Sequence, residues 1–333
     1  MNGRWTFHGG RLGEARAVYG DAAGPWLDLS TGINPHGWAS RDGLGTDAIA
    51  IDWRALPDED GLRALERAAA ASFGVDPGFV CALPGTEIGL RLIGGLLPGP
   101  ARHVAPAYRT HGEIFAGSVA IAFDAIDTLS AGTLVIANPN NPDGRIVAPQ
   151  ALAAHLSRLS AASGWLVVDE AFADAVPEAS VAGLVADDRP LVIFRSFGKF
   201  FGLAGLRLGF VIGPRALIAR FRAALGSWPV SAAALAIGAA AYRDLDWAGD
   251  MRARLLADAA ALDAVLGGHG LRPIGACPLF RLVETDRAAA LFDRLARRGI
   301  LTRPFDHDPR WLRFGLAGSD AALGRLDRAL GDG

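Results

Sequence analysis

The stretch Leu191-Val-Ile-Phe-Arg-Ser-Phe-Gly-Lys199 joins a short apolar run to a small polar segment that ends in a lysine. Lys199 is the only lysine of the chain, in which lysine and arginine together number 33. Arginine supplies a plain positive charge, but it cannot lose its proton and form an imine with a carbonyl, as a primary amine can. Codon bias would explain the missing lysines. It would not explain why the remaining one directly follows a predicted buried strand, so Lys199 is the first candidate catalytic residue.

The composition indicates a globular protein of 333 residues, with 51% hydrophobic and 20% charged residues, long enough for one large domain or two. The formal net charge of −2 predicts no nucleic-acid and no membrane partner. Cys81 and Cys277 provide neither a disulfide framework nor metal-ligand spacing, so we expect no metal and a reducing, cytoplasmic location. The N-terminus lacks a signal-peptide pattern, and the longest apolar run, 232–242, is too short to cross a bilayer.

Short apolar strands alternate with helical patterns between about residues 60 and 215. This alternation is typical of an α/β fold with a mostly parallel central sheet flanked by helices on both faces. A helix is expected to begin at Thr86, with Thr86 itself as N-cap. The predicted strands cover 133–137, 165–168, 191–194 and 208–212, and the other predicted helices centre on Leu65 and Leu156.

We expect three parts along the chain. Residues 1–40 are rich in glycine and predict an irregular N-terminal arm that packs with the small domain and the substrate site. Residues 41–230 form the expected large domain. Residues 231–333 change to two helical stretches followed by strands and helices, which predicts a smaller α+β domain at the C-terminus.

Polar residues follow three of the predicted strands at their carboxyl ends, where ligands bind in open α/β sheets. They are Asn138-Pro-Asn-Asn-Pro142, the pair Asp169-Glu170 and the segment 196–199. Taken singly, an Asn-Pro cluster is usually a turn and a strand-terminal Asp is often a helix cap. Together they deliver an amide, a carboxylate and an amine to one edge of the sheet, which favours a shared functional site.

A pyridoxal phosphate site needs this set of groups: an amine for the aldehyde, a carboxylate that keeps the pyridine nitrogen protonated, and donors for the phosphate. The segment Pro84-Gly-Thr-Glu87 opens a predicted helix, whose free N–H groups favour an anion. Arg207, eight residues after Lys199, is suited to bind a phosphate through two donors. An ordinary capped helix would explain the Gly-Thr pair alone.

The motifs Asn-x-Asn-Asn-Pro, Asp-Glu-Ala-Phe and Ser-x-x-Lys followed by Gly-x-Arg resemble those of the fold-type-I, aminotransferase-like pyridoxal-phosphate enzymes, close to histidinol-phosphate aminotransferases. The resemblance implies the transferase fold of that group and a homodimer with its active site near the subunit interface. It implies that Lys199 carries the cofactor, that Asp169 partners the pyridine nitrogen and that Arg313 binds a substrate carboxylate. The other implied cofactor-binding residues are Gly85, Thr86, Tyr108, Asn141, Ser196 and Arg207.

Two positions depart from the pattern of many such relatives. Phe172 stands where they have a tyrosine, so one hydrogen bond to the ring oxygen of the cofactor is expected to be missing. Leu56 stands where a tyrosine before Pro-Asp reaches the cofactor phosphate of the neighbouring subunit. The second departure removes that expected contact between subunits.

The N-terminal arm resembles that of the L-threonine-O-3-phosphate decarboxylases of cobalamin biosynthesis, through Phe7-His-Gly-Gly10 and Asp28-Leu-Ser-Thr-Gly-Ile-Asn-Pro35. The resemblance implies that His8, Gly32 and Arg303 lie at the substrate phosphate, although relatives often have Asn where this chain has Gly32. It implies decarboxylation of L-threonine O-3-phosphate to (R)-1-amino-2-propanol O-2-phosphate and CO2.

The choice of reaction depends on which Cα bond of the substrate stands perpendicular to the cofactor ring, because its electrons then overlap the π system. If Arg313 and the phosphate ligands hold the carboxylate perpendicular, CO2 leaves; if they hold the Cα–H bond so, transamination begins. A histidinol-phosphate-type aminotransferase is therefore the alternative, and a non-catalytic cofactor-binding regulator is a further one. The regulator is disfavoured because the arm is too short and too glycine-rich for a helix-turn-helix appendage.

Overall fold

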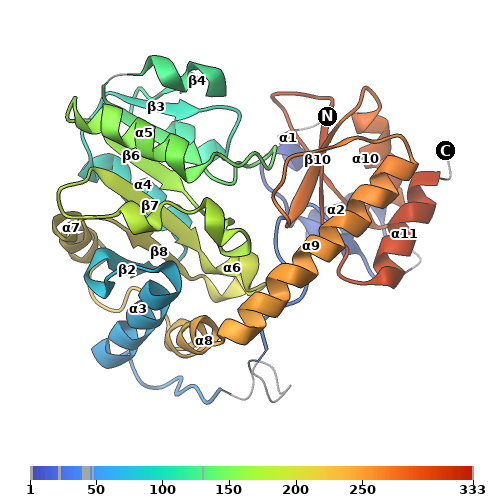
Figure 1. Ribbon diagram of the computed structural model, residues 1–333. Helices are drawn as coiled ribbons and strands as arrows, with labels where there is room; N and C mark the ends of the chain where they lie inside the picture. Colours follow the sequence, from blue (N-terminus) through green and yellow to red (C-terminus); the bar gives the residue numbers. More distant parts are fainter. Residues whose placement is uncertain (1–2, 22–23, 40–45, 47–48, 130, 332–333) are drawn as a thin grey trace. The chain divides into compact units, whose positions relative to one another are not determined.

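The computed structural model describes residues 3–21, 24–39, 46, 49–129 and 131–331. They form two compact units, each described here by itself (Figure 1). Unit 1 contains residues 1–36, 142–145 and 250–333, and unit 2 contains residues 37–141 and 146–249. Within the described ranges, no helix has the length and apolar character that a membrane crossing requires.

Unit 2 is built on a seven-stranded sheet with the order β2-β8-β7-β6-β5-β3-β4. The five strands from β7 to β4 are parallel, whereas β8 runs antiparallel to both of its neighbours. The predicted mostly parallel sheet is therefore confirmed. The strands are β2 (Val80–Leu83), β3 (Ala101–Val104), β4 (Val119–Ile121), β5 (Thr133–Ala137), β6 (Trp165–Asp169), β7 (Leu191–Ser196) and β8 (Gly209–Ile212).

Alternate residues of the central strands face opposite sides of this sheet, so each strand contributes to two apolar layers. One layer joins Val135, Val167 and Val192 to Ile93 of α4 and Phe221 of α7 in a single buried cluster. Helix α5 packs on β6 and lies in front of the sheet in Figure 1. The helices of unit 2 are α3 (Glu59–Phe73), α4 (Thr86–Leu96), α5 (Pro149–Ser160), α6 (Phe197–Phe200), α7 (Arg215–Leu225) and α8 (Ala232–Arg243).

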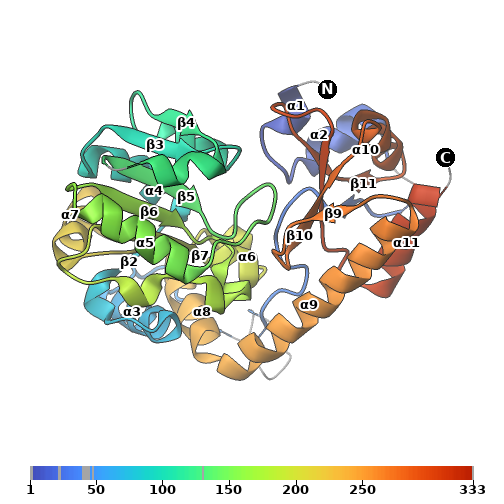
Figure 2. The same ribbon diagram turned by 45° about the horizontal axis from the view of Figure 1, so that its top comes forward.

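Helices α3 and α8 pack side by side, as both views show (Figures 1 and 2). Helix α9 (Leu245–Gly268) follows, and the division between the two units falls within it. Short 3-10 turns connect several elements of unit 2: η2 (Pro77–Phe79), η3 (Arg109–Glu113), η4 (Phe123–Thr128), η5 (Ala173–Ala175), η6 (Pro177–Ala179), η7 (Ala182–Leu184) and η8 (Ala204–Leu206).

Unit 1 contains a four-stranded antiparallel sheet with the order β12-β13-β10-β9, and a parallel pair of β1 with β11. The strands are β1 (Leu27–Asp28), β9 (Pro273–Ile274), β10 (Phe280–Glu284), β11 (Ile300–Leu301), β12 (Arg303–Pro304) and β13 (Trp311–Gly315). The helices are α1 (Gly3–Thr6), α2 (Leu12–Tyr19), α10 (Ala288–Arg297) and α11 (Asp320–Gly331). Helices α10 and α11 contact each other beside this sheet (Figure 2).

Two expectations about local structure were wrong. The N-terminal arm is not wholly irregular, because it contains α1, α2 and β1; α2 buries Ala15 and contacts α10. Thr86 is not an N-cap: Gly85 occupies that position, and no side chain caps the helix. The division into an arm, a large domain and a small domain stays a prediction, although α8, assigned to the small domain, packs on α3 within unit 2.

Candidate active site

Lys199 lies in the four-residue helix α6, directly after β7. Buried aromatic rings anchor this short helix: Phe197 stacks on Phe201 at 4.5 Å, and Phe200 meets Trp247 edge to face at 5.5 Å. Lys199 itself is half-buried, and its Nζ lies 5.9 Å from the centre of the Phe172 ring. The packing of its neighbours therefore fixes the backbone of Lys199 at the carboxyl end of the sheet.

Asp169 is the last residue of β6 and is 6% exposed. It pairs in register with Phe194 of β7, two residues before the end of that strand. One carboxylate oxygen, Oδ1, accepts a hydrogen bond from the Ala171 N–H at 3.1 Å, and the other, Oδ2, lies 2.9 Å from His111 Nε2. Lys199 and Asp169 thus extend from the same edge of two adjacent parallel strands, as the strand pattern predicted.

His111 was missed by the sequence analysis. It lies in η3, is fully buried, and packs edge to face on Tyr108 at 5.8 Å. Its Nδ1 has no hydrogen-bond partner among the described residues, and its Nε2 donates to the Asp169 carboxylate, which can only accept. The only signal in the sequence is the spacing of three from Tyr108, which places both rings on one side of a helical turn.

Tyr108 is fixed by a carboxylate on α4. Its hydroxyl donates to Glu87 Oε2 at 2.9 Å, and Thr110 donates to the same oxygen at 2.9 Å. Burial raises the pKa of Tyr108 to about 12, so the phenol stays protonated and remains a donor. Burial alone would raise the pKa of Glu87, but hydrogen bonds from Arg91, Thr110 and Tyr108 lower it. The ring of Tyr108 is therefore held in one orientation.

The start of α4 lies close to the Arg207 side chain. Gly85 has a left-handed φ of 87°, and a Cβ at this position would lie 2.8 Å from Arg207 Nη2. A Cβ at Gly209 would lie 2.8 Å from the Thr86 nitrogen, and Gly209 pairs with Ser196. A Cβ at either glycine would therefore collide with Arg207 or Thr86, so the start of α4, Arg207 and the strand next to Ser196 approach one another closely. Free N–H groups and a guanidinium fit a phosphate, which the expected cofactor carries.

The three asparagines after β5 have separate tasks. The Asn138 amide donates to Val147 and Ala179 carbonyls, both at 3.0 Å, and the Asn140 amide donates to the Pro106 carbonyl at 3.1 Å. Both side chains hold the loop to its neighbours. Asn141 is half-buried and is the last residue of this segment of unit 2. It stays the residue predicted to bind the ring oxygen of the cofactor.

Glu170, the neighbour of Asp169, belongs to a buried ion pair that joins two strands. Arg195 donates to Glu170 Oε2 at 2.9 Å and also pairs with Asp174, and all three side chains are buried. Burial raises the pKa of Glu170, while the charge of Arg195 opposes that rise. This ion pair joins the residue after β6 to the residue before Ser196, and so links the two strand ends that carry Asp169 and Lys199.

Unit 1 brings the expected substrate ligands together. Arg313 on β13 is 2% exposed, and its Nη2 donates to the Ser30 carbonyl at 3.0 Å. Arg303 pairs with Arg313 across β12 and β13. Burial lowers the pKa of Arg313 well below its ordinary value, and the charge of Arg303 lowers it further. Two arginines on adjacent strands, one of them buried, are suited to bind an anion.

The N-terminal arm reaches the same place. Arg303 Nη2 donates to the Phe7 carbonyl at 3.4 Å, and the Gly10 N–H donates to Ser30 Oγ at 2.7 Å. A Cβ at Gly9 would lie 2.3 Å from the Ser30 carbonyl oxygen, so only glycine permits this approach. His8, beside Phe7, is exposed, and Gly32 is buried. The structure thus brings Arg303 and Arg313 together and places the backbone next to His8 beside Arg303.

Neither of the two cysteines is suited to act as a nucleophile in this chain. Cys81 and Cys277 are buried and free, and burial raises the pKa of each thiol to about 12. Neither residue is therefore a thiolate at neutral pH. Among the residues that the structure describes, no cluster of three or more His, Cys, Asp or Glu side chains is arranged to hold a metal ion.

Comparison with known proteins defines the class. The family model for aminotransferases of class I and II matches residues 108–330, and the chain belongs to this family. Within it, the chain is 43% identical over 335 residues to a threonine-phosphate decarboxylase from Sinorhizobium sp., covering 97% of each protein. It is 42% identical to a threonine-phosphate decarboxylase from Pseudomonas aeruginosa, over 97% of this chain and 96% of that relative.

Among solved structures, histidinol-phosphate aminotransferase from Sinorhizobium meliloti, in complex with pyridoxal-5'-phosphate, has the same fold. The TM-score is 0.82 at 21% sequence identity, covering 96% of this chain and 93% of that structure. The aminotransferase-like fold expected from the three motifs is confirmed. The roles expected for individual site residues stay predictions.

Proposed function

We propose that this protein is a pyridoxal-phosphate-dependent decarboxylase of L-threonine O-3-phosphate that releases CO2 and (R)-1-amino-2-propanol O-2-phosphate, in cobalamin biosynthesis. The observation that carries the proposal is the 43% identity to a threonine-phosphate decarboxylase over 97% of the chain, which includes the N-terminal arm. Within that arm Gly10 bonds to Ser30, and the Ser30 carbonyl accepts a hydrogen bond from Arg313, so the arm is joined to a residue expected to bind the substrate.

Unit 2 supplies the residues for the cofactor. Lys199 would bind its aldehyde carbon, and Asp169 would hold a proton on the ring nitrogen. Tyr108 would cover one face of the ring and Asn141 would donate to the ring oxygen. When bound, pyridoxal phosphate supplies a ring that accepts the electron pair of the broken Cα bond. The residues expected to hold the cofactor phosphate are Gly85, Thr86, Ser196 and Arg207.

Unit 1 supplies the residues for the substrate. Arg313 would bind the carboxylate, and Arg303, His8 and Gly32 would bind the phosphate. Binding of the substrate at both its carboxylate and its phosphate would fix its rotation about the bonds to Cα. This rotation decides which Cα bond breaks. After CO2 departs, the Lys199 amino group would return a proton to Cα.

The experiment separates decarboxylation from transamination. Purified protein with pyridoxal phosphate is given L-threonine phosphate, with and without 2-oxoglutarate. CO2 release without any keto acid supports the proposal. Formation of glutamate from histidinol phosphate and 2-oxoglutarate would establish the aminotransferase alternative instead.

Lys199→Ala tests the cofactor assignment separately. The variant should lose the visible absorbance of covalently held cofactor while Arg207 and the α4 N-terminus still bind its phosphate. Retention of the band in the variant would contradict the role of Lys199. Arg195→Lys is not a suitable control, because Arg195 holds a buried ion pair.

We also propose that two copies associate into a homodimer in the cytoplasm. Unit 2 exposes several large apolar side chains: Trp53 is 76% exposed, Leu56 is 66% exposed and Trp228 is 59% exposed. Exposed apolar residues of this size favour a protein interface. We also propose that the chain is divided into the N-terminal arm, the large domain and the small domain expected from the sequence.

A further inference from the structure

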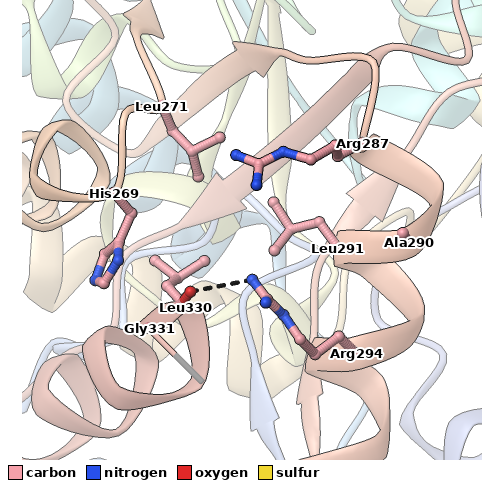
Figure 3. A pocket seen from close by; sticks show the side chains of 8 residues that line it. All are labelled: His269, Leu271, Arg287, Ala290, Leu291, Arg294, Leu330 and Gly331. Carbon is pink, nitrogen blue, oxygen red and sulfur yellow. Dashed lines mark hydrogen bonds between the residues drawn. The ribbon is translucent and has the colours of Figure 1, made fainter. Parts of the chain in front are cut away.

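A second cationic pocket lies in unit 1, and it shares no residue with the groups assigned to the cofactor or the substrate. Its walls come from the segment after α9, from α10 and from the end of α11, and its volume is about 310 Å³. No acidic side chain is among the described residues that line it. Figure 3 shows the lining residues: His269, Leu271, Arg287, Ala290, Leu291, Arg294, Leu330 and Gly331.

Two arginines of α10 face this pocket. Arg287 is the N-cap residue and Arg294 lies in the last turn, and a spacing of seven residues brings both to one side of a helix. Within the described ranges, the Arg287 side chain makes no hydrogen bond and no ion pair; its backbone N–H donates to Thr285 Oγ1 and its carbonyl accepts from the Leu291 N–H. Arg297 on the same helix, in contrast, is paired with Asp293 at 2.8 Å. Arg287 therefore keeps all five of its N–H donors for a ligand.

Arg294 is held in place before any ligand arrives. Its Nη2 donates to the Leu330 carbonyl at 3.1 Å, the bond drawn in Figure 3. Its Nε is buried and has no acceptor among the described residues. A guanidinium that is already ordered, and still has a donor to offer, loses little conformational freedom when an anion binds.

The floor of the pocket is apolar. Leu271, Leu291 and Leu330 are 4%, 6% and 5% exposed and form its inner surface. His269 stands on one wall, with its Nε2 bonded to Asp327 at 2.7 Å. A small hydrocarbon group fits against the leucines, and their low polarity strengthens the attraction between a guanidinium and an anion at the rim.

We propose that this pocket binds a small phosphate monoester with a short hydrocarbon part. Two guanidinium groups match the double negative charge and the several acceptor oxygens of a phosphate better than the single charge of a carboxylate. The phosphate lies between Arg287 and Arg294, and the hydrocarbon part lies on the leucines. This site does not depend on the decarboxylase proposal, because none of its residues takes part in that reaction.

Arg287→Gln tests the site, because it removes the charge and breaks no bond of the described structure. Arg297→Gln, on the same helix, is the matched control. Each protein, loaded with pyridoxal phosphate, is titrated with inorganic phosphate by calorimetry. We expect the wild type to bind phosphate at one additional site that the Arg287→Gln variant lacks. If the variant keeps that site, we expect it to bind phosphate there about tenfold or more weakly than the wild type. Arg297→Gln should bind as the wild type does.

A phosphate titration of Arg287→Gln that coincides with the wild-type titration would overturn the proposal. So would an equal loss of binding in Arg297→Gln, because the effect would then come from net charge alone. Melting temperatures in phosphate-free buffer check that both variants are folded. Turnover of Arg287→Gln without added phosphate should equal that of the wild type, so a failed substrate assignment would leave this result unchanged.

Discussion

The carboxylate of Asp169 is held by one donor on each oxygen, His111 Nε2 at 2.9 Å and the Ala171 N–H at 3.1 Å. These two bonds come from different segments of the chain and fix the plane of the carboxylate. A carboxylate that cannot rotate presents its remaining lone pairs in a single direction, which the proposed bond to a ring nitrogen requires. His111 is thus a positioning residue in the proposed site.

At the residue scale, His111→Phe removes the donor, and His111→Gln keeps an N–H close to the position of Nε2. Loss of a hydrogen bond to a charged group costs about 1.5–3 kcal/mol, which corresponds to roughly a tenfold to hundredfold change. We therefore expect His111→Phe to weaken pyridoxal phosphate binding or to lower kcat by that factor, with KM for the substrate little changed. His111→Gln should recover most of the loss.

Cofactor titration by absorbance and steady-state kinetics measure the two quantities. Equal behaviour of the Gln and Phe variants would show that His111 acts only through packing. A change in KM alone would place its effect at the substrate instead of Asp169.

At the scale of elements, the start of α4 is the feature on which the proposed phosphate site depends. Gly85→Ala places a Cβ 2.8 Å from Arg207 Nη2, at a φ of 87° that costs a non-glycine residue about 1–2 kcal/mol. We expect weaker binding of pyridoxal phosphate together with a lower free energy of unfolding. Calorimetric titration and urea unfolding measure the two effects.

Gly95→Ala is the control within the same helix. A Cβ there has no atom within 4 Å, and alanine inside a helix is about 1 kcal/mol more favourable than glycine. This variant should be more stable and should bind the cofactor as the wild type does. If both variants weaken cofactor binding equally, the approach of Arg207 to Gly85 does not control the site.

The sequence predicted the central elements and missed the connections between them. Buried parallel strands such as 133–137 are uniform apolar runs, and their ends identified Asp169 and Lys199 because ligand sites lie at carboxyl ends. Thr86 was assigned as N-cap from its side chain, whereas the backbone geometry of Gly85 decides the helix start. His111 was not predictable, since its bond to Asp169 joins residues 58 apart in the chain.

At the scale of the whole molecule, three histidines with lowered pKa values make stability depend on pH. Burial is the main cause that lowers the pKa of His103, His155 and His307 below 6.5. The unfolded chain therefore binds more protons than the folded chain below pH 6.5, and the stability that neutral histidines contribute is lost as the pH falls through this range.

We expect the free energy of unfolding in urea to decrease between pH 7 and pH 5. Replacement of one group, His103→Gln, should reduce the slope of this decrease. An unchanged slope in the variant would show that His103 does not contribute, and a slope of opposite sign would point to the buried carboxylates Glu66 and Glu170, whose pKa values burial raises.

The proposed association of two copies is tested on the exposed apolar side chains. Trp228→Ser and Trp53→Ser remove large side chains that are 59% and 76% exposed, so each should leave the free energy of unfolding of a single chain almost unchanged. Sedimentation velocity should show a dimer for the wild type and a shift toward the monomer for the variants. A wild type that sediments as a monomer contradicts the proposal.

A chain with one lysine has an unusual reactivity toward amine-directed reagents. Lys199 is half-buried beside the Phe172 ring, and it is the only side-chain amine that a succinimidyl ester can acylate. The mass added at Lys199, read from the peptide that contains it, therefore counts accessible centres without any assay of turnover. The same scarcity allows a fluorophore or a solid support to be attached through the α-amino group alone when a ligand shields Lys199.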